Sequence, residues 1–243
     1  MTMTAPHAAP SPRPARVEEL QARIRGMQAT RLDSKAVPTH PALAEVLPGG
    51  TLREGTVVQV EGSTTLLMAL LAGPSASGRW VAVAGMPEFG VEAAARFGIA
   101  LDRLVLVPDP GRQWLTVVAA LADVIPVVAV RPGGRVSPAE SSRLQARLRQ
   151  RGTTLLVAGD WPGSDARLGV EASEWRGLER GHGHLAEREV VVSVAGRGEF
   201  VRRTRSRLRL PGRHLEFAPA ALGPAPGLAD PIPLDDFERR ATG

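Results

Sequence analysis

Residues 57–84 read as a strand, a tight glycine turn, an apolar helix, a loop and a second strand. This is the layout of a phosphate-binding βαβ unit, in which G-x-x-x-x-G-K-[ST] joins the strand to the helix. The backbone N–H groups and the lysine of that loop hold the phosphates. Here Glu61 and Gly62 are followed directly by Ser63, Thr64 and Thr65. The turn is therefore too short to wrap a phosphate, and it contains no lysine.

Lysine is nearly absent from the whole chain, because Lys35 is its only instance among 30 basic residues. Arginine does not replace the compact charge of a P-loop lysine. A general bias from lysine to arginine explains the count, but it would not remove a lysine that catalysis required. We therefore expect no P-loop phosphate site in this turn.

Composition excludes several other classes of protein. The chain has no cysteine, which rules out disulfides, thiol catalysis and cysteine metal sites. Its longest apolar run, residues 66–72, is far shorter than the roughly 20 residues that span a bilayer. The N-terminus lacks the charged and then apolar pattern of a signal peptide. We expect a cytoplasmic protein without membrane contact.

Strand and helix patterns alternate through the middle of the chain. Ser137 and Glu140 form a capping box at the start of one helix, and Gly152 should end it. The alternation predicts an α/β fold with a mostly parallel sheet flanked by helices on both faces. The expected strands are residues 56–60, 80–84, 103–107, 125–130 and 153–158, and the expected helices are residues 63–72, 91–97, 113–122 and 137–151.

The sequence pattern changes after Trp161, where strand-like segments follow one another without intervening helices. Residues 168–175, 190–195 and 199–210 therefore predict antiparallel edge strands near the C-terminus. His182 and His184 lie between two of these segments. We interpret them as part of a turn, because two histidines without further ligands are a weak metal signal.

Four regions follow from these patterns: a disordered tail (1–15), an N-terminal helix and connection (16–42), a core domain (43–210) and a proline-rich tail without regular structure (211–243). Leu20, Ile24 and Met27 form one apolar stripe on the N-terminal helix. That stripe either packs on the helix's own domain or docks on a partner. A second glycine pattern, residues 73–80, should follow the helix and precede a strand, which is the wrong context for a phosphate site.

The order of several motifs over residues 43–210 resembles the RecA recombinase core. These motifs are Leu47-Pro48-Gly49-Gly50 with Gly55, the strand into Glu61-Gly62, Ser63-Thr64-Thr65-Leu66, residues 81–84, residues 97–104 and residues 199–210. More specifically, the chain is similar to the ImuA-type accessory proteins of bacterial translesion mutasomes, including their actinobacterial branch. The resemblance implies a RecA-like fold and a role in damage-induced (SOS) mutagenesis, near the nucleoid of DNA-damaged cells.

The same resemblance implies the partners: an ImuB-type polymerase homologue and an error-prone polymerase complex. Direct DNA binding and self-association are left open.

Departures from the RecA core concern its nucleotide site. Ser63, Thr64 and Thr65 align with the end of the phosphate loop, and Arg131 stands where a metal-orienting Asp should follow a strand. Such an arginine would repel Mg²⁺, and Glu88, near the water-activating position, would have no phosphate to act on. Because the phosphate clamp and the metal ligand are lost together, we expect a protein that is not an enzyme, with no catalytic residue, no bound metal and no cofactor.

Two further segments are candidate interaction sites. An arginine-rich strand could follow a nucleic-acid backbone, with an aromatic ring for stacking; its residues are Phe200, Arg202, Arg203, Arg205, Arg207 and Arg209. The alternative is an edge strand whose charges only prevent edge-to-edge pairing. Leu234 and Phe237 lie in an acidic and apolar tail that could order on a partner, stay solvated, or fold back over the arginine strand.

The function predicted from the sequence is a non-catalytic scaffold for translesion DNA synthesis. Two alternatives belong to other classes. One is an active P-loop ATPase of the recombinase kind with an unusual loop, and the other is a damage-induced inhibitor of cell division that resembles SulA.

Overall fold

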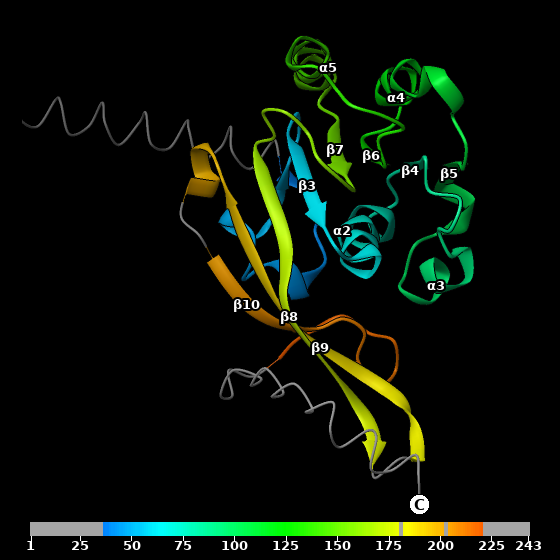
Figure 1. Cartoon of the computed structure of the whole chain (residues 1–243), viewed down its shortest axis with the longest axis vertical. Coiled ribbons are helices and arrows are strands. Elements are labelled where there is room, and N and C mark those ends of the chain that lie inside the picture. The colour runs from blue at the N-terminus through cyan, green and yellow to red at the C-terminus, as the bar shows by residue number, and fades with distance from the viewer. Residues whose placement is uncertain (1–35, 180–181, 202–203, 221–243) are drawn as a thin grey trace, which may run out of the picture. The chain divides into compact units, whose positions relative to one another are not determined.

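The structure, a computed structural model, describes residues 36–179, 182–201 and 204–220 (Figure 1). The chain divides into two compact units, residues 1–36 and 37–243. The described residues from Val37 onward belong to the second unit. Several residues singled out in the sequence lie outside the described ranges, namely Leu20, Ile24, Met27, Arg202, Arg203, Leu234 and Phe237.

A nine-stranded sheet forms the centre of the second unit, in the order β11-β10-β9-β8-β3-β7-β6-β4-β5. The strands are β3 (Val57–Glu61), β4 (Val81–Ala84), β5 (Leu104–Val107), β6 (Val127–Val130), β7 (Thr154–Val157), β8 (Ala166–Glu179), β9 (His182–Gly196), β10 (Thr204–Arg209) and β11 (Ala218–Pro219). Strands β3 to β7 pair in parallel, β8 is parallel to β3, and the pairs β8–β9, β9–β10 and β10–β11 are antiparallel. The predicted mostly parallel sheet with antiparallel strands toward the C-terminus is confirmed.

Helices cover both faces of the sheet, because alternate residues of each strand point to opposite sides. One core contains α2 (Thr64–Ala76) and Ala94 of α3 (Val91–Arg96), with Val58 and Val60 of β3. The other contains side chains of α4 (Trp114–Ala122) and α5 (Pro138–Arg151), with Val57 of β3. Helices α4 and α5 lie side by side (Figure 1). Short pieces complete the unit: β1 (Ala36–Val37) and β2 (Leu52–Arg53) in a separate two-stranded sheet, and the 3-10 turns Pro41–Leu43, Pro48–Gly50, Leu101–Arg103, Gly111–Gln113 and Gly198–Val201.

The predicted capping box is confirmed at the start of α5. The Ser137 hydroxyl accepts a hydrogen bond from the Glu140 N–H at 3.3 Å, and the Glu140 carboxylate accepts one from the Ser137 N–H at 2.9 Å. These bonds satisfy backbone donors that the helix itself cannot pair. Gly152 ends the helix in the left-handed region, with φ 73°. The local sequence therefore determines both ends of α5.

Helix α2 is longer than predicted, because it continues past Ala72 to Ala76 and includes Pro74. The second glycine pattern therefore begins inside a helix. Gly73 lies where a Cβ would come within 2.4 Å of the His40 backbone N, so the glycine permits close packing against that segment. Val37 and Ala42 are buried in the same core as α2. The segment before the predicted core domain thus contributes to that core.

Two expectations near the C-terminal end of the described chain were wrong. Residues 199–210 are not one strand, since Gly198–Val201 is a 3-10 turn and β10 begins at Thr204. Residues 211–220 are not an irregular tail, since β11 pairs with β10. Phe217 is 6% exposed, and its ring centroid lies 4.7 Å from that of Phe97. Burial of this aromatic ring outweighs the turn-forming prolines around it.

Candidate functional site

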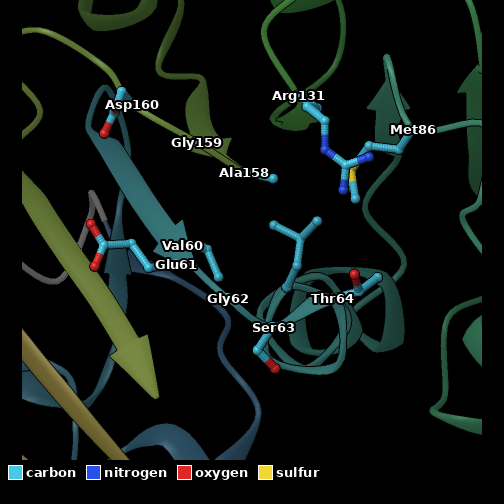
Figure 2. A pocket seen from close by; sticks show the side chains of 11 residues that line it. Val60, Glu61, Gly62, Ser63, Thr64, Met86, Arg131, Ala158, Gly159 and Asp160 are labelled. Carbon is cyan, nitrogen blue, oxygen red and sulfur yellow. The ribbon is translucent and has the colours of Figure 1, made fainter. Parts of the chain in front are cut away.

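A cavity of about 470 Å³ lies where β3, β4, β6 and β7 end, the side of a parallel sheet at which ligands bind in α/β folds (Figure 2). Its lining residues come from the carboxyl ends of these strands, from the segments that follow them and from the first turn of α2. The lining consists of Val60, Glu61, Gly62, Ser63, Thr64, Leu67, Met86, Arg131, Ala158, Gly159 and Asp160. Four of the five predicted turn residues, Glu61 to Thr64, are therefore brought together with Arg131, which is 67 or more positions away in the chain. Thr65 does not line the cavity.

The turn between β3 and α2 contains only Gly62 and Ser63, since Glu61 ends the strand and Thr64 begins the helix. Gly62 has φ 67°, a left-handed conformation that glycine adopts without steric cost. The Ser63 hydroxyl accepts a hydrogen bond from the Leu66 N–H at 3.1 Å and caps the helix. A P-loop needs four residues between its two glycines alone. This turn, both of whose residues are described, is too short to wrap around a phosphate.

Glu61 lines the cavity but pairs with its neighbour in the sheet. Its carboxylate lies 3.0 Å from the Arg167 Nε on β8, and Figure 2 shows the side chain directed toward that strand. The pair is about half exposed, so its contribution to stability is small. Glu61 therefore contributes little free negative charge to the cavity.

Arg131 follows β6 and extends its guanidinium into the cavity beside Met86 (Figure 2). Its Nη1 donates a hydrogen bond to Glu88 in the segment after β4. A hydrogen bond with its own backbone and the bond from Arg131 lower the pKa of Glu88. The Arg131 N–H donates to the Ala84 carbonyl at 3.0 Å, which continues the β4–β6 ladder. An ion pair thus occupies the positions where the RecA resemblance puts a metal-orienting and a water-activating carboxylate.

Asp160 and Gln59 are site residues that sequence reasoning missed. Gln59 is 1% exposed in the middle of β3, where its Nε2 donates to the Gly159 carbonyl at 3.0 Å and its Oε1 accepts from the Ser164 hydroxyl. These bonds connect β3 to the loop that carries Asp160. A single glutamine in the apolar run Val57–Glu61 was the available signal, because a buried polar side chain requires a partner.

The described residues contain no group of three or more histidine, aspartate or glutamate side chains that could hold a metal ion. Asp160 and Glu61 are the carboxylates that line the cavity, and Glu61 is paired. His182 and His184 both belong to β9, so the interpretation that they form part of a turn was wrong. Among the helices of the described chain, none is long and apolar enough to cross a membrane.

In the described part of the arginine strand, Arg205 is exposed and Leu208 is buried. One of its charges, however, is paired with a carboxylate of β8. The Arg205 Nε lies 2.8 Å from a Glu171 oxygen, and Arg209 faces Glu189 in the β9–β10 register. Arg207 also has an interaction partner. The arginine strand therefore carries less unpaired positive charge than the sequence of β10 indicates.

Phe200 is not available for stacking on a base. It belongs to the 3-10 turn Gly198–Val201 rather than to β10. Its side chain is 4% exposed in the core that also contains α2. The expectation failed because the apolar ring gains more from burial in the core than from exposure on an edge strand.

Two comparisons of sequence match part of the chain. Residues 45–163 match the sequence model of the family described as MT3502 N-terminal domain. Over 128 residues the chain is 40% identical to Uncharacterized protein Rv3395c of Mycobacterium tuberculosis, an alignment that covers 51% of this chain and 63% of that relative. The match thus spans less than two thirds of the relative's length.

Two solved structures are similar in backbone. The KaiC-like protein PH0186 of Pyrococcus horikoshii has a TM-score of 0.50 and 14% identity, and the match covers 77% of this chain and 99% of that chain. The flagellar accessory protein FlaH of Methanocaldococcus jannaschii has a TM-score of 0.46 and 10% identity, with 71% and 93% covered. At such low identity the first likeness concerns the fold alone. The chain has a RecA-like α/β fold.

Proposed function

We propose that this protein is a non-catalytic, RecA-like scaffold of damage-induced translesion DNA synthesis that binds an ImuB-type polymerase homologue within an error-prone polymerase complex. The observation that carries the non-catalytic part is the two-residue turn, Gly62 and Ser63, between β3 and α2. Phosphoryl transfer depends on positioning and on charge stabilisation at the phosphates. A turn that cannot surround a phosphate removes the first requirement. The Arg131–Glu88 ion pair removes the second, because it replaces a free carboxylate for Mg²⁺.

The first test is equilibrium binding of a fluorescent ATP analogue in the presence of Mg²⁺. We expect no binding at micromolar protein, and no change on Thr64→Ala. The competing proposal of an active ATPase predicts micromolar affinity and DNA-stimulated phosphate release that Thr64→Ala abolishes. Either of those results would overturn the non-catalytic assignment.

The translesion role is supported by the motif order that resembles ImuA-type proteins, and its test concerns the partner. Tagged full-length protein should recover a polymerase homologue from DNA-damaged cells. Two variants locate the contact: Leu20→Asp/Ile24→Asp in the N-terminal stripe, and Leu234→Asp/Phe237→Asp in the tail. Loss of the partner in one variant and retention in the other would assign the contact. Recovery of a tubulin-like division protein without any polymerase-related protein would favour the division inhibitor.

DNA is a secondary partner in this proposal, because Glu171 and Glu189 lie beside the arginines of β10. Fluorescence anisotropy with single-stranded DNA at several salt concentrations measures the number of phosphate contacts. We expect weak binding with a shallow salt dependence. If Arg205→Ala removes tight binding and lowers the salt slope by about 1, the stripe is instead a primary DNA site.

A further inference from the structure

We propose that a groove between α4 and α5 binds the acidic C-terminal segment, residues 228–238, of a second copy of this chain. The groove lies on the face of the sheet opposite to α2. Two adjoining hollows of about 350 and 370 Å³ share Arg143 and Arg147 and form it. This inference does not depend on the proposed translesion role.

The groove combines an apolar floor with a cationic rim. Leu115 and Ala119 of α4 and Leu144 and Ala146 of α5 supply the apolar part. The rim consists of Arg143, Arg147, Gln150 and Arg151 of α5, with Glu140 at one end. Val124, which follows the C-terminal end of α4, is 78% exposed. Apolar side chains bordered by charge are typical of a protein-binding surface.

The rim has more positive charge than its own carboxylates neutralise. Arg147 and Arg151 both donate to the single carboxylate of Asp123, at 2.8 Å and 3.1 Å from their Nε atoms. The Glu140 carboxylate accepts hydrogen bonds from Ser137 at the helix cap. Helix α5 as a whole contains four arginines and one acid. On β10, by contrast, Arg205 is paired with Glu171 of β8 and Arg209 lies opposite Glu189 of β9, so α5 is the better site for an acidic ligand.

Residues 228–238 have the complementary chemistry. The segment LADPIPLDDFE contains four acids and no base, interspersed with Leu228, Ile232, Leu234 and Phe237. The 14 residues of α5 make a groove of about 20 Å, which six residues in an extended conformation also span. Pro231 and Pro233 favour such an extended conformation. Residues 232–237 therefore match the groove in length, polarity and charge.

The occupant comes from a second copy because the chain's own tail starts on the other side of the sheet. Phe217 belongs to the core on the α2 face, and β11 is five strands from β7 in the sheet order. That path is about 24 Å along the sheet, with a layer about 10 Å thick on each side. The twelve residues from Ala220 to Ile232 have an average reach of about 19 Å. Docking on a neighbour avoids this stretching.

The test is the association state of full-length variants, measured by light scattering and sedimentation. We expect the unmodified chain to self-associate with rising concentration, and less so in 0.5 M salt. Arg143→Glu, Ala146→Glu and Asp235→Lys/Asp236→Lys should each weaken association at least tenfold. Arg205→Glu, a matched exposed arginine on β10, should leave it unchanged. Ala146→Glu lies at an exposed helix position, so its effect does not arise from loss of folding.

Combinations of variants provide the decisive result. Arg143→Glu mixed with Asp235→Lys/Asp236→Lys should form a one-to-one complex, because one chain retains its groove and the other its tail. Placing both changes in one chain should restore self-association. A chain that stays monomeric at 100 μM, an effect of Arg205→Glu in place of Arg143→Glu, or crosslinks between tail and groove only within one chain would overturn the proposal.

Discussion

The Arg131 guanidinium, which lines the cavity, donates a hydrogen bond to the Glu88 carboxylate and thereby joins the end of β6 to the segment after β4. Both side chains are about half exposed, so the pair is screened by solvent. Its importance lies in position, since it occupies the place at which the RecA resemblance puts two free carboxylates. The charges of Arg131 and Glu88 therefore neutralise each other within the protein.

Arg131→Ala should raise the pKa of Glu88 toward its ordinary value of 4.5, because the bond from Arg131 is one of the causes that lower it. A lowered pKa in the folded state stabilises the fold above the unfolded value, and that contribution is lost as the pH falls through the folded pKa. The stability difference between the two proteins should therefore be present at neutral pH and absent in acid. Carboxyl-carbon NMR titration measures the pKa directly.

Arg96→Ala is the control for this titration, because Arg96 pairs with Glu92 on the surface of α3. It should leave the pKa of Glu88 unchanged. The same Glu88 pKa in unmodified protein and in Arg131→Ala would contradict the ion pair.

Gly85→Ala should destabilise the protein by at least about 2 kcal/mol. Gly85 has φ 71°, and a Cβ there would lie 2.4 Å from the Arg131 carbonyl oxygen. Gly111→Ala is the matched control, because Gly111 has φ 65° with nothing within 4 Å of its Cβ position. It should cost only the backbone strain, about 1 kcal/mol. Urea denaturation compares the two, and equal losses would show that the β4 and β6 ends are not in close contact.

Ser137→Ala should lower the free energy of unfolding by about 1 kcal/mol, because it leaves the Glu140 N–H without its capping acceptor. Ser142 is an exposed serine of the same helix, and Ser142→Ala should change stability by less than about 0.5 kcal/mol. Thermal and urea denaturation of the two variants make the comparison. A larger effect from Ser142→Ala would argue against the capping box.

Gln59→Leu should cost about 1–3 kcal/mol, because the Gly159 carbonyl and the Ser164 hydroxyl would lose their partner in a buried site. A double-mutant cycle with Ser164→Ala isolates one of the two bonds. The coupling energy should be at least about 0.5 kcal/mol. Additive effects would mean that the glutamine does not connect β3 to the Asp160 loop. Hydrogen exchange should show faster opening of residues 158–164 in Gln59→Leu.

Local patterns were sufficient to predict the parallel part of the sheet and the limits of α5. Apolar runs such as residues 125–130 form strands buried on both faces, and the Ser137 cap depends on residues three positions apart. The short turn at Gly62 could also be predicted, because the strand pattern before it and the helix pattern after it leave few residues between them. Each of these features depends on chemistry that is adjacent in the chain.

Only the tertiary structure determined which charges and rings are free. Glu171 of β8 pairs with Arg205, Glu189 of β9 lies opposite Arg209, and Phe200 turns into the core. These outcomes depend on contacts between residues that are distant in the chain. Likewise, α4 and α5 form a cationic groove because they pack side by side on one face. The sequence alone determined that the frame has no phosphate loop, since a loop requires residues that are not there. Burial and pairing decided the rest, because they depend on the distance between side chains in space.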